Sequence, residues 1–313
     1  MREGFCKLIY AKTSIMAFQW EGIFSALLTP FTSDDKLDLD MFEKNLAAQV
    51  GAGIHGIIIG GSLGEASTIT DKEKEEMVEF SVEYLNGQIP VILNIAESTT
   101  RTAMLQAANA KTWGADGIML LPPMRYKTDD RETISFFKTV ANSTDLPVMI
   151  YNNPVDYKID TRPEMFDGLL ECKNIMALKE SSRDVTNLSR MKNRFGDRFK
   201  ILCGVDTLAM EELCLGADGW VAGLVCAFPK ETVSIYNLVK AGKVGEAIKI
   251  YRWFMPLLEL DIHPKLVQYI KLAAAKTGLG NEYVRAPRLI LEGEERERIL
   301  KIINDGIATR PKL

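Results

Sequence analysis

The chain has 313 residues, of which 47% are hydrophobic, 26% charged and 8% aromatic. This composition is typical of a soluble globular protein and excludes a disordered or fibrous chain. The formal net charge is -4, from 38 basic and 42 acidic residues that are mixed along the sequence. No basic segment is suited to nucleic acid, and no apolar run approaches the roughly 18 residues of a membrane span. We therefore expect neither nucleic acid nor membrane as a partner.

Histidine and cysteine usage points away from metal chemistry and disulfides. The two histidines, His55 and His263, lie far apart, whereas zinc sites usually draw several ligands from short motifs. The cysteines are odd in number and show no C-x-x-C spacing; they are Cys6, Cys172, Cys203, Cys214 and Cys226. Such cysteines are typical of core residues in a reducing cytoplasm. We expect a cytoplasmic protein without a metal.

Short apolar, β-branched segments alternate along the chain with amphipathic segments of helical period. Residues 1–19 precede this pattern and are expected to form an N-terminal extension. The expected strands are 22–29, 55–60, 91–95, 117–121, 148–151, 175–179, 200–203 and 219–223. The expected helices between them are 39–52, 72–86, 99–113, 131–143, 162–171, 184–195 and 206–215.

The expected strands are continuous apolar runs, as in parallel strands buried on both faces. A Gly-Ala-Asp-Gly turn occurs at 114–117 and again at 216–219, which indicates a repeated helix-to-strand connection. Eight such units predict an α/β fold, a (β/α)8 TIM barrel over residues 20–228; a doubly wound open sheet is the alternative. Residues 229–313 are expected to form a C-terminal helical annex, with helices at 231–241, 243–260, 264–277 and 294–308.

The expected strand 175–179 ends in a lysine, Lys179. In a (β/α)8 barrel, catalytic residues lie at the carboxyl ends of the strands. A lysine there is either a solvated strand cap or an amine held inside the barrel mouth. In the second case burial lowers its pKa, and the neutral amine can attack a ketone or imine carbon.

The strand at 148–151 ends in Tyr151-Asn152-Asn153-Pro154. Proline keeps the backbone before it extended, which fixes the course of the chain beyond the strand. A phenol at this place can carry a proton to and from a substrate hydroxyl. The alternative is an aromatic side chain that only packs at a loop.

Two further strand ends offer groups for an anion. The segment Gly60-Gly61-Ser62-Leu63-Gly64-Glu65 is neither a Walker A loop nor a G-x-G-x-x-G motif. Its glycines can turn successive N–H groups inward, which suits a carboxylate, or they can simply make a tight turn. The segment 121–126 supplies the guanidinium of Arg125, which can fix the substrate or lie on the surface.

Three motifs together resemble the dihydrodipicolinate synthase and N-acetylneuraminate lyase family. They are Gly61-Ser62-Leu63-Gly64-Glu65, Tyr151-Asn152-x-Pro154 and Lys179-Glu180, in this order and spacing. The likeness runs from about residue 22 to the C-terminus and includes residues 29–31 and Gly204. It implies a class I, Schiff-base-forming (β/α)8 enzyme, commonly a homo-oligomer (a tetramer or a dimer), that needs no cofactor because the lysine is the electron sink.

The resemblance also implies roles for individual residues. Lys179 would be the Schiff-base nucleophile and Tyr151 the proton shuttle. Ser62 and Leu63, together with Gly61, would hold the substrate carboxylate, largely through backbone N–H groups. Arg125 and Gly204 would complete the substrate site.

The sequence departs from the family pattern at three places. Dihydrodipicolinate synthases carry an arginine two residues after Tyr-Asn-x-Pro, where this chain has Asp156. Their Gly-Thr-Thr-Gly-Glu motif has a second threonine where this chain has Leu63, and their Pro-Tyr-Tyr relay motif is here residues 123–125, Pro-Met-Arg. These differences argue against lysine biosynthesis and against cleavage of sialic acid.

A closer likeness is to the 1-pyrroline-4-hydroxy-2-carboxylate deaminases. The segments that carry it are 151–158, 179–182, 253–258, 266–272 and 285–289. We therefore expect a small 2-oxo acid or cyclic imino acid as substrate, with deamination and dehydration of the hydroxy-pyrroline to 2-oxoglutarate semialdehyde. The alternatives are a 2-keto-3-deoxy sugar acid aldolase or dehydratase that releases pyruvate, and a true dihydrodipicolinate synthase. A non-catalytic barrel is disfavoured because Lys179 and Tyr151 are both present.

Overall fold

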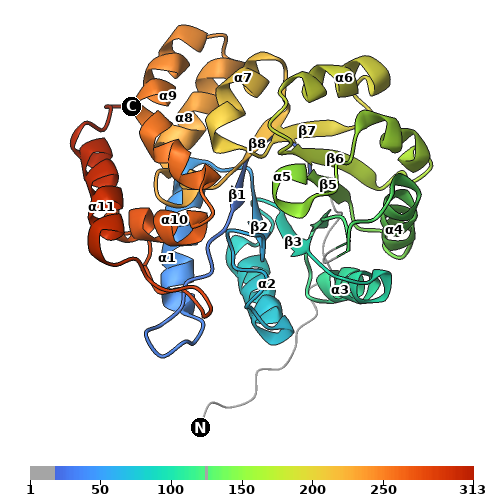
Figure 1. Ribbon diagram of the computed structural model, residues 1–313, viewed down its shortest axis with the longest axis horizontal. Coiled ribbons are helices and arrows are strands. Elements are labelled where there is room, and N and C mark those ends of the chain that lie inside the picture. The colour runs from blue at the N-terminus through green and yellow to red at the C-terminus, as the bar shows by residue number, and fades with distance from the viewer. Residues whose placement is uncertain (1–17, 124–125) are drawn as a thin grey trace.

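The computed structural model describes residues 18–123 and 126–313. Its centre is a closed barrel of eight parallel strands, in which β1 pairs with both β2 and β8 (Figure 1). The strands are β1 (Gly22–Ala26), β2 (Gly56–Ile59), β3 (Val91–Ile95), β4 (Gly117–Leu120), β5 (Val148–Asn152), β6 (Ile175–Glu180), β7 (Lys200–Cys203) and β8 (Gly219–Ala222). The predicted TIM barrel is confirmed, and the open sheet is excluded.

Two glycines allow β1 and β8 to meet at the closing seam. Gly22 pairs with Gly219 in the register of the two strands. A Cβ atom on Gly219 would lie 2.3 Å from the carbonyl oxygen of Gly22, which is closer than any side chain tolerates. Gly22 itself has a φ of +93°, a conformation that glycine adopts at little cost. The glycines that begin these strands are therefore required for closure.

Helices surround the barrel at the places that the sequence pattern predicts. They are α1 (Leu39–Ala52), α2 (Asp71–Leu85), α3 (Thr100–Thr112), α4 (Asp130–Asn142), α6 (Thr186–Phe195) and α7 (Ala209–Cys214). Side-chain caps fix several starts: Asp38 accepts from the N–H of Met41, and Thr70 forms a capping box with Glu73. Each cap satisfies a backbone donor that the first helical turn leaves free.

The structure differs from two local expectations and adds one short helix that was not expected. Residues 162–171 contain a 3-10 helix, η1 (Pro163–Leu169), because Gly168 packs tightly against Ile134 of α4 and lowers helix propensity. The expected helix 206–215 begins with a separate 3-10 turn, η2 (Asp206–Leu208). A short helix, α5 (Pro154–Tyr157), follows β5 directly and has no apolar period that would have predicted it.

The C-terminal region is helical, as expected. It comprises η3 (Leu224–Cys226), α8 (Pro229–Lys240), α9 (Val244–Leu258), η4 (Glu259–Ile262), α10 (Leu266–Lys276) and α11 (Gly293–Ala308). Helix α8 packs on β1 and β8 and takes the place of the eighth barrel helix. Helix α9 packs against α8, and α11 packs against α9 and α10 at the edge of the molecule (Figure 1). Contacts between η4 and η2 bring this region to the mouth of the barrel.

Within the described part of the chain, none of the helices combines the length and the apolar character needed to cross a membrane.

Candidate active site

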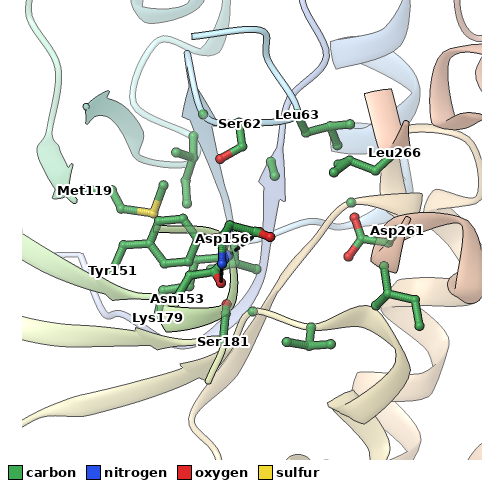
Figure 2. Close-up of a pocket in the computed structure, with 18 of the residues that line it drawn as sticks. Ser62, Leu63, Met119, Tyr151, Asn153, Asp156, Lys179, Ser181, Asp261 and Leu266 are labelled. Carbon is green, nitrogen blue, oxygen red and sulfur yellow. Dashed lines mark hydrogen bonds between the residues drawn. The ribbon is translucent and has the colours of Figure 1, made fainter. Parts of the chain in front are cut away.

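A cavity that opens to solvent lies at the carboxyl ends of the strands; the space between its walls, with the open part included, is about 680 Å³. Six of the seven predicted site residues line it: Gly61, Ser62, Leu63, Tyr151, Lys179 and Gly204 (Figure 2). The seventh, Arg125, lies outside the described residues. Residues that are far apart in the sequence thus meet in one place because parallel strands of a barrel all end at the same rim.

Lys179 lies inside this cavity and is largely shielded from water. It is the fifth residue of β6, and only 7% of its surface is exposed. Its Nζ atom lies 4.0 Å from the centroid of the Tyr151 ring. Burial lowers the pKa of the amine, and the carboxyl group of Asp261 opposes that shift more than any other charged neighbour. A larger share of the amine is therefore neutral and able to attack a carbonyl carbon.

Tyr151 presents its phenol beside the lysine, from the next strand in the barrel. The side chain is 5% exposed, and its hydroxyl accepts a hydrogen bond of 3.1 Å from Nδ2 of Asn153. Burial raises the pKa of the phenol to about 12. The hydroxyl thus stays protonated near neutral pH and can donate its proton to an oxygen that forms in the cavity.

The chain beside Lys179 is held by the carboxylate of Glu180. It accepts hydrogen bonds from the N–H of Ser182 at 2.6 Å, from Nδ2 of Asn187 at 2.7 Å and from Nδ2 of Asn152 at 3.3 Å. These contacts give Glu180 a structural role beside the lysine. They connect the ends of β5 and β6, which carry Tyr151 and Lys179.

The turn that contains Gly61, Ser62 and Leu63 is anchored from outside the cavity. Nδ2 of Asn94 donates to the carbonyl of Gly60 at 2.8 Å, and Oγ1 of Thr29 donates to the carbonyl of Gly64 at 2.7 Å. Within the described residues, no hydrogen-bond acceptor pairs with the backbone N–H of Ser62 or Leu63. These N–H groups are therefore available to an anion in the cavity.

The structure adds three charged side chains to the cavity that the motifs did not identify as a set. Asp156 and Arg183 lie at its rim, where both are exposed. Arg183 has a φ of +68°, which non-glycine residues rarely adopt, and no ion-pair partner among the described residues. Asp156 accepts a hydrogen bond of 2.8 Å from Nδ2 of Asn153. Asp261 comes from η4 and lies on the other side of the cavity from Tyr151 (Figure 2).

Asp261 is placed there by close packing of η4 on the end of β8. A Cβ atom on Gly223 would lie 2.6 Å from its Oδ1 atom, so only glycine leaves room for the carboxyl group. Burial, reinforced by the negative charge of Asp206, raises the pKa of Asp261 well above its usual range. Asp206 lies fully buried and accepts from Nε1 of Trp220 at 2.9 Å and from the N–H of Leu224 at 2.8 Å.

Sequence reasoning could identify Asp156 only as a departure from a motif, and it could not identify Asp261. Asp261 follows no strand, and it lies in a connection between two helices. No periodicity or spacing marks such a residue as part of a site. Among residues 18–123 and 126–313, no group of three or more histidine, cysteine or acidic side chains is placed to hold a metal ion.

Comparison with known families gives one description for nearly the whole chain. The model of the "Dihydrodipicolinate synthetase family" matches residues 19–305. Among curated proteins, the 4-hydroxy-tetrahydrodipicolinate synthase of Exiguobacterium sibiricum is 33% identical over 275 residues, which cover 87% of this chain and 92% of that protein. The synthase of Endomicrobium trichonymphae is 31% identical over 287 residues, or 91% and 98% of the two chains.

Solved structures show the same architecture. The 4-hydroxy-tetrahydrodipicolinate synthase of Methylacidiphilum fumariolicum SolV superposes with a TM-score of 0.88 at 27% identity, over 93% of this chain and 97% of that one. Dihydrodipicolinate synthase from Aquifex aeolicus gives a TM-score of 0.86 at 28% identity, over 91% and 97%. The barrel and its C-terminal helices are thus shared over almost their full length.

Proposed function

Since the chain belongs to the dihydrodipicolinate synthetase family of lysine Schiff-base enzymes, we propose that it converts 1-pyrroline-4-hydroxy-2-carboxylate into 2-oxoglutarate semialdehyde and ammonia. The observation that carries this proposal is the pair of carboxyl groups on the cavity wall, Asp156 and Asp261. Asp156 stands at the position of the arginine that binds the second substrate in the synthases.

Two carboxyl groups on the cavity wall disfavour a substrate with a second carboxylate there, because like charges repel. They suit a substrate that carries a hydroxyl group and gains an amine during the reaction. The hydroxy-pyrroline has both properties: it has one carboxylate and one hydroxyl, and opening of its ring leaves a cationic amine at the far end. Asp156 at the rim can bind that amine.

The first steps assign roles to Lys179 and Tyr151. The neutral amine of Lys179 attacks the imine carbon that bears the carboxylate, the bond from that carbon to the ring nitrogen breaks, and the ring nitrogen takes up a proton. The lysine is then joined to the substrate as a protonated Schiff base. This iminium draws electrons from the neighbouring carbon, which loses a proton, and the hydroxyl group one carbon further leaves as water.

Asp261 fits the departure of that hydroxyl group. A carboxyl group whose pKa is raised by burial holds a proton closer to neutral pH and can give it to a leaving hydroxyl. Proton shifts through Tyr151 then turn the terminal amine into an imine, which water hydrolyses to an aldehyde and ammonia. A second water releases the 2-oxo acid from Lys179. One water leaves and two are consumed, so the overall reaction adds one water and releases one ammonia.

The substrate carboxylate has a binding site in this scheme. Ser62 and Leu63 line the cavity at the turn after β2, together with Gly61, and among the described residues no acceptor pairs with their N–H groups. Backbone N–H groups in such a turn bind carboxylates without a charged side chain. The small Gly204 leaves the space above Lys179 open.

A second candidate is 4-hydroxy-tetrahydrodipicolinate synthase, the name that the cited relatives carry. Arg183 favours it, because an unpaired guanidinium at the cavity rim can bind the carboxylate of an incoming semialdehyde. Asp156 disfavours it, since it places a negative charge where the synthases have an arginine.

The deciding experiment compares three reactions with one preparation of the enzyme. The hydroxy-pyrroline is assayed for ammonia, pyruvate plus aspartate semialdehyde for ring formation, and a 2-keto-3-deoxy sugar acid for pyruvate release. We expect ammonia release with the first substrate and its loss in Lys179→Arg. Ring formation without ammonia would establish the synthase instead, and pyruvate release alone would establish the aldolase.

We also propose that the enzyme works as a homo-oligomer, a tetramer or a dimer, in the cytoplasm. Exposed apolar side chains between α10 and α11, among them Leu289 and Ile290, support an interface there. Free thiols at the four described cysteines support a reducing compartment. Light scattering of the purified protein measures the oligomer directly.

A further inference from the structure

One arginine at the rim of the cavity has a backbone conformation that its residue type disfavours. Arg183 lies three residues after the end of β6 and lines the cavity, and its φ is +68°. Residues other than glycine rarely adopt this left-handed conformation, because the Cβ atom crowds the backbone. Such a conformation costs free energy and persists only where the surrounding chain enforces it.

Hydrogen bonds hold the chain on both sides of Arg183. Before it, the N–H of Ser182 donates to the carboxylate of Glu180 at 2.6 Å. After it, the N–H of Asp184 donates to Oγ of Ser182 at 3.2 Å, and Oδ1 of Asp184 accepts from the N–H of Thr186 at 3.0 Å. These contacts fix the backbone at position 183 whichever side chain stands there. Glycine would fit at less cost, which points to a role for the guanidinium itself.

The guanidinium of Arg183 has no ion-pair partner within residues 18–123 and 126–313. The neighbouring carboxylate, that of Asp184, forms an ion pair of 2.7 Å with Arg190 instead. The side chain of Arg183 is exposed at the cavity rim. A guanidinium keeps its charge at any physiological pH and offers five N–H donors, so this one is free to attract an anion.

The cavity wall would otherwise repel a carboxylate. Besides Arg183, the charged side chains that line it in the described part of the chain are Asp156, Lys179 and Asp261. Burial lowers the pKa of Lys179, so its amine supplies only part of a positive charge. Burial also raises the pKa of Asp261 well above its usual range, whereas Asp156 is exposed at the rim. Without Arg183, an anionic substrate would meet the negative charge of Asp156 at the entrance.

We propose that Arg183 is a specificity-determining residue, which attracts the carboxylate of the substrate into the cavity. The N–H groups of Ser62 and Leu63 can hold the same carboxylate once the carbonyl carbon reaches Lys179. Opposite charges about 10 Å apart near a protein surface attract strongly enough to change binding on the order of 10-fold. The inference rests on the Schiff-base chemistry of the family and not on the hydroxy-pyrroline, because every candidate substrate carries a carboxylate beside the carbon that is attacked.

The test compares pyruvate with pyruvamide, a neutral analogue in which an amide replaces the carboxylate. Borohydride trapping at several concentrations, followed by mass spectrometry, gives the second-order rate constant of Schiff-base formation for each probe. We expect Arg183→Gln to lower this constant about 5- to 20-fold for pyruvate and to leave it within about twofold for pyruvamide. Arg183→Lys keeps the charge and should lose less than about threefold with pyruvate.

Two further measurements separate attraction by charge from a structural role. Raising NaCl from about 0.02 to about 0.5 M should slow trapping of pyruvate several-fold in the unmodified enzyme and much less in Arg183→Gln, because salt screens exposed charges. Arg183→Gly relieves the backbone, so its midpoint of urea unfolding should equal or exceed that of the unmodified protein while its rate with pyruvate falls. The matched control is Arg194→Gln, which removes an exposed arginine that contacts Asp167 near the far end of α6 and should keep the original rate.

Several results would overturn the inference. Equal losses with pyruvate and pyruvamide, or a lower unfolding midpoint in Arg183→Gly, would assign the arginine a structural role. Unchanged trapping of pyruvate in Arg183→Gln, with a loss only when aspartate semialdehyde is added, would make it a binding residue for a second substrate. An unmodified enzyme that formed no adduct with pyruvate would also contradict the inference. Ammonia release is measured separately, and its absence with the hydroxy-pyrroline would contradict the proposed substrate alone.

Discussion

Gly204 and Lys179 occupy adjoining space so closely that a Cβ atom on the glycine would lie 2.6 Å from Cε of the lysine. The same Cβ atom would lie 2.1 Å from Oγ of Ser181. Both atoms would have to move, and the amine would leave its place over the Tyr151 ring. The glycine after β7 therefore fixes the position of the nucleophile on β6.

Gly204→Ala should reduce the borohydride-trapped adduct by at least about tenfold and destabilise the fold by about 1–3 kcal/mol, the usual cost of overpacking. Mass spectrometry of the trapped lysine and urea unfolding measure the two effects. The control is Gly245→Ala, where an added Cβ atom meets nothing within 4 Å and the residue lies in helix α9. Normal trapping in Gly204→Ala would show that the amine is not confined in this way.

Asp261 should tune the reactivity of Lys179 from across the cavity. The ionised form of Asp261 is the leading influence that raises the pKa of the amine against the effect of burial, while burial of Asp261 keeps part of it protonated. Asp261→Asn removes the ionised form altogether, so the pKa of Lys179 should fall further. The ascending limb of the pH profile for Schiff-base formation should then move to lower pH, because the amine attacks in its neutral form.

The profile is obtained from trapping rates at a series of pH values. Glu259→Gln, an exposed change in the same 3-10 helix, serves as the control and should leave the limb in place. A limb that stays fixed in Asp261→Asn, or that moves to higher pH, would contradict the expected interaction.

The buried amine should also make stability depend on pH. Its pKa in the folded protein lies below the ordinary value of 10.5 that it regains on unfolding. Between these two values the unfolded chain binds one more proton than the folded chain, so Lys179 causes stability to rise with pH in this window. Lys179→Met removes the contribution, and the variant should be more stable than the unmodified protein at pH 7, by a margin that shrinks as the pH nears 10.5.

Urea unfolding at pH 7, 8, 9 and 10 measures that margin. Lys173→Met, an exposed change just before the same strand, should show no such trend. A margin that is constant over this range, or that grows with pH, would mean that the amine is solvated in the folded protein.

The fold could be predicted because the strands are apolar segments buried on both faces and two of the helix-to-strand connections share the same Gly-Ala-Asp-Gly turn. The positions of Lys179 and Tyr151 in the cavity could be predicted because both residues end barrel strands and because the motifs that contain them resemble those of a known family. The place of Asp261 could not be predicted, since it depends on how the connection between α9 and α10 packs over the barrel mouth. Local sequence pattern thus identifies the residues at the strand ends, whereas tertiary packing determines which residues of the C-terminal helices reach the site.

A buried ion pair between Lys271 and Glu65 supports the turn that carries Ser62 and Leu63. Lys271 of α10 and Glu65, which follows the turn after β2, are both fully buried and form an ion pair. The N–H of Arg285 donates to the same carboxylate at 3.1 Å. Lys271→Met leaves the fully buried carboxylate of Glu65 with fewer partners, which should cost about 3–5 kcal/mol in urea unfolding. The turn carries Ser62 and Leu63, so pyruvate affinity should weaken in parallel.

Lys276→Met on an exposed face of the same helix should change stability by less than about 0.5 kcal/mol. The double variant Glu65→Leu with Lys271→Met removes the stranded charge and should recover part of the lost stability. If it were less stable than Lys271→Met by the full cost of a second independent change, the pair would not act as a unit.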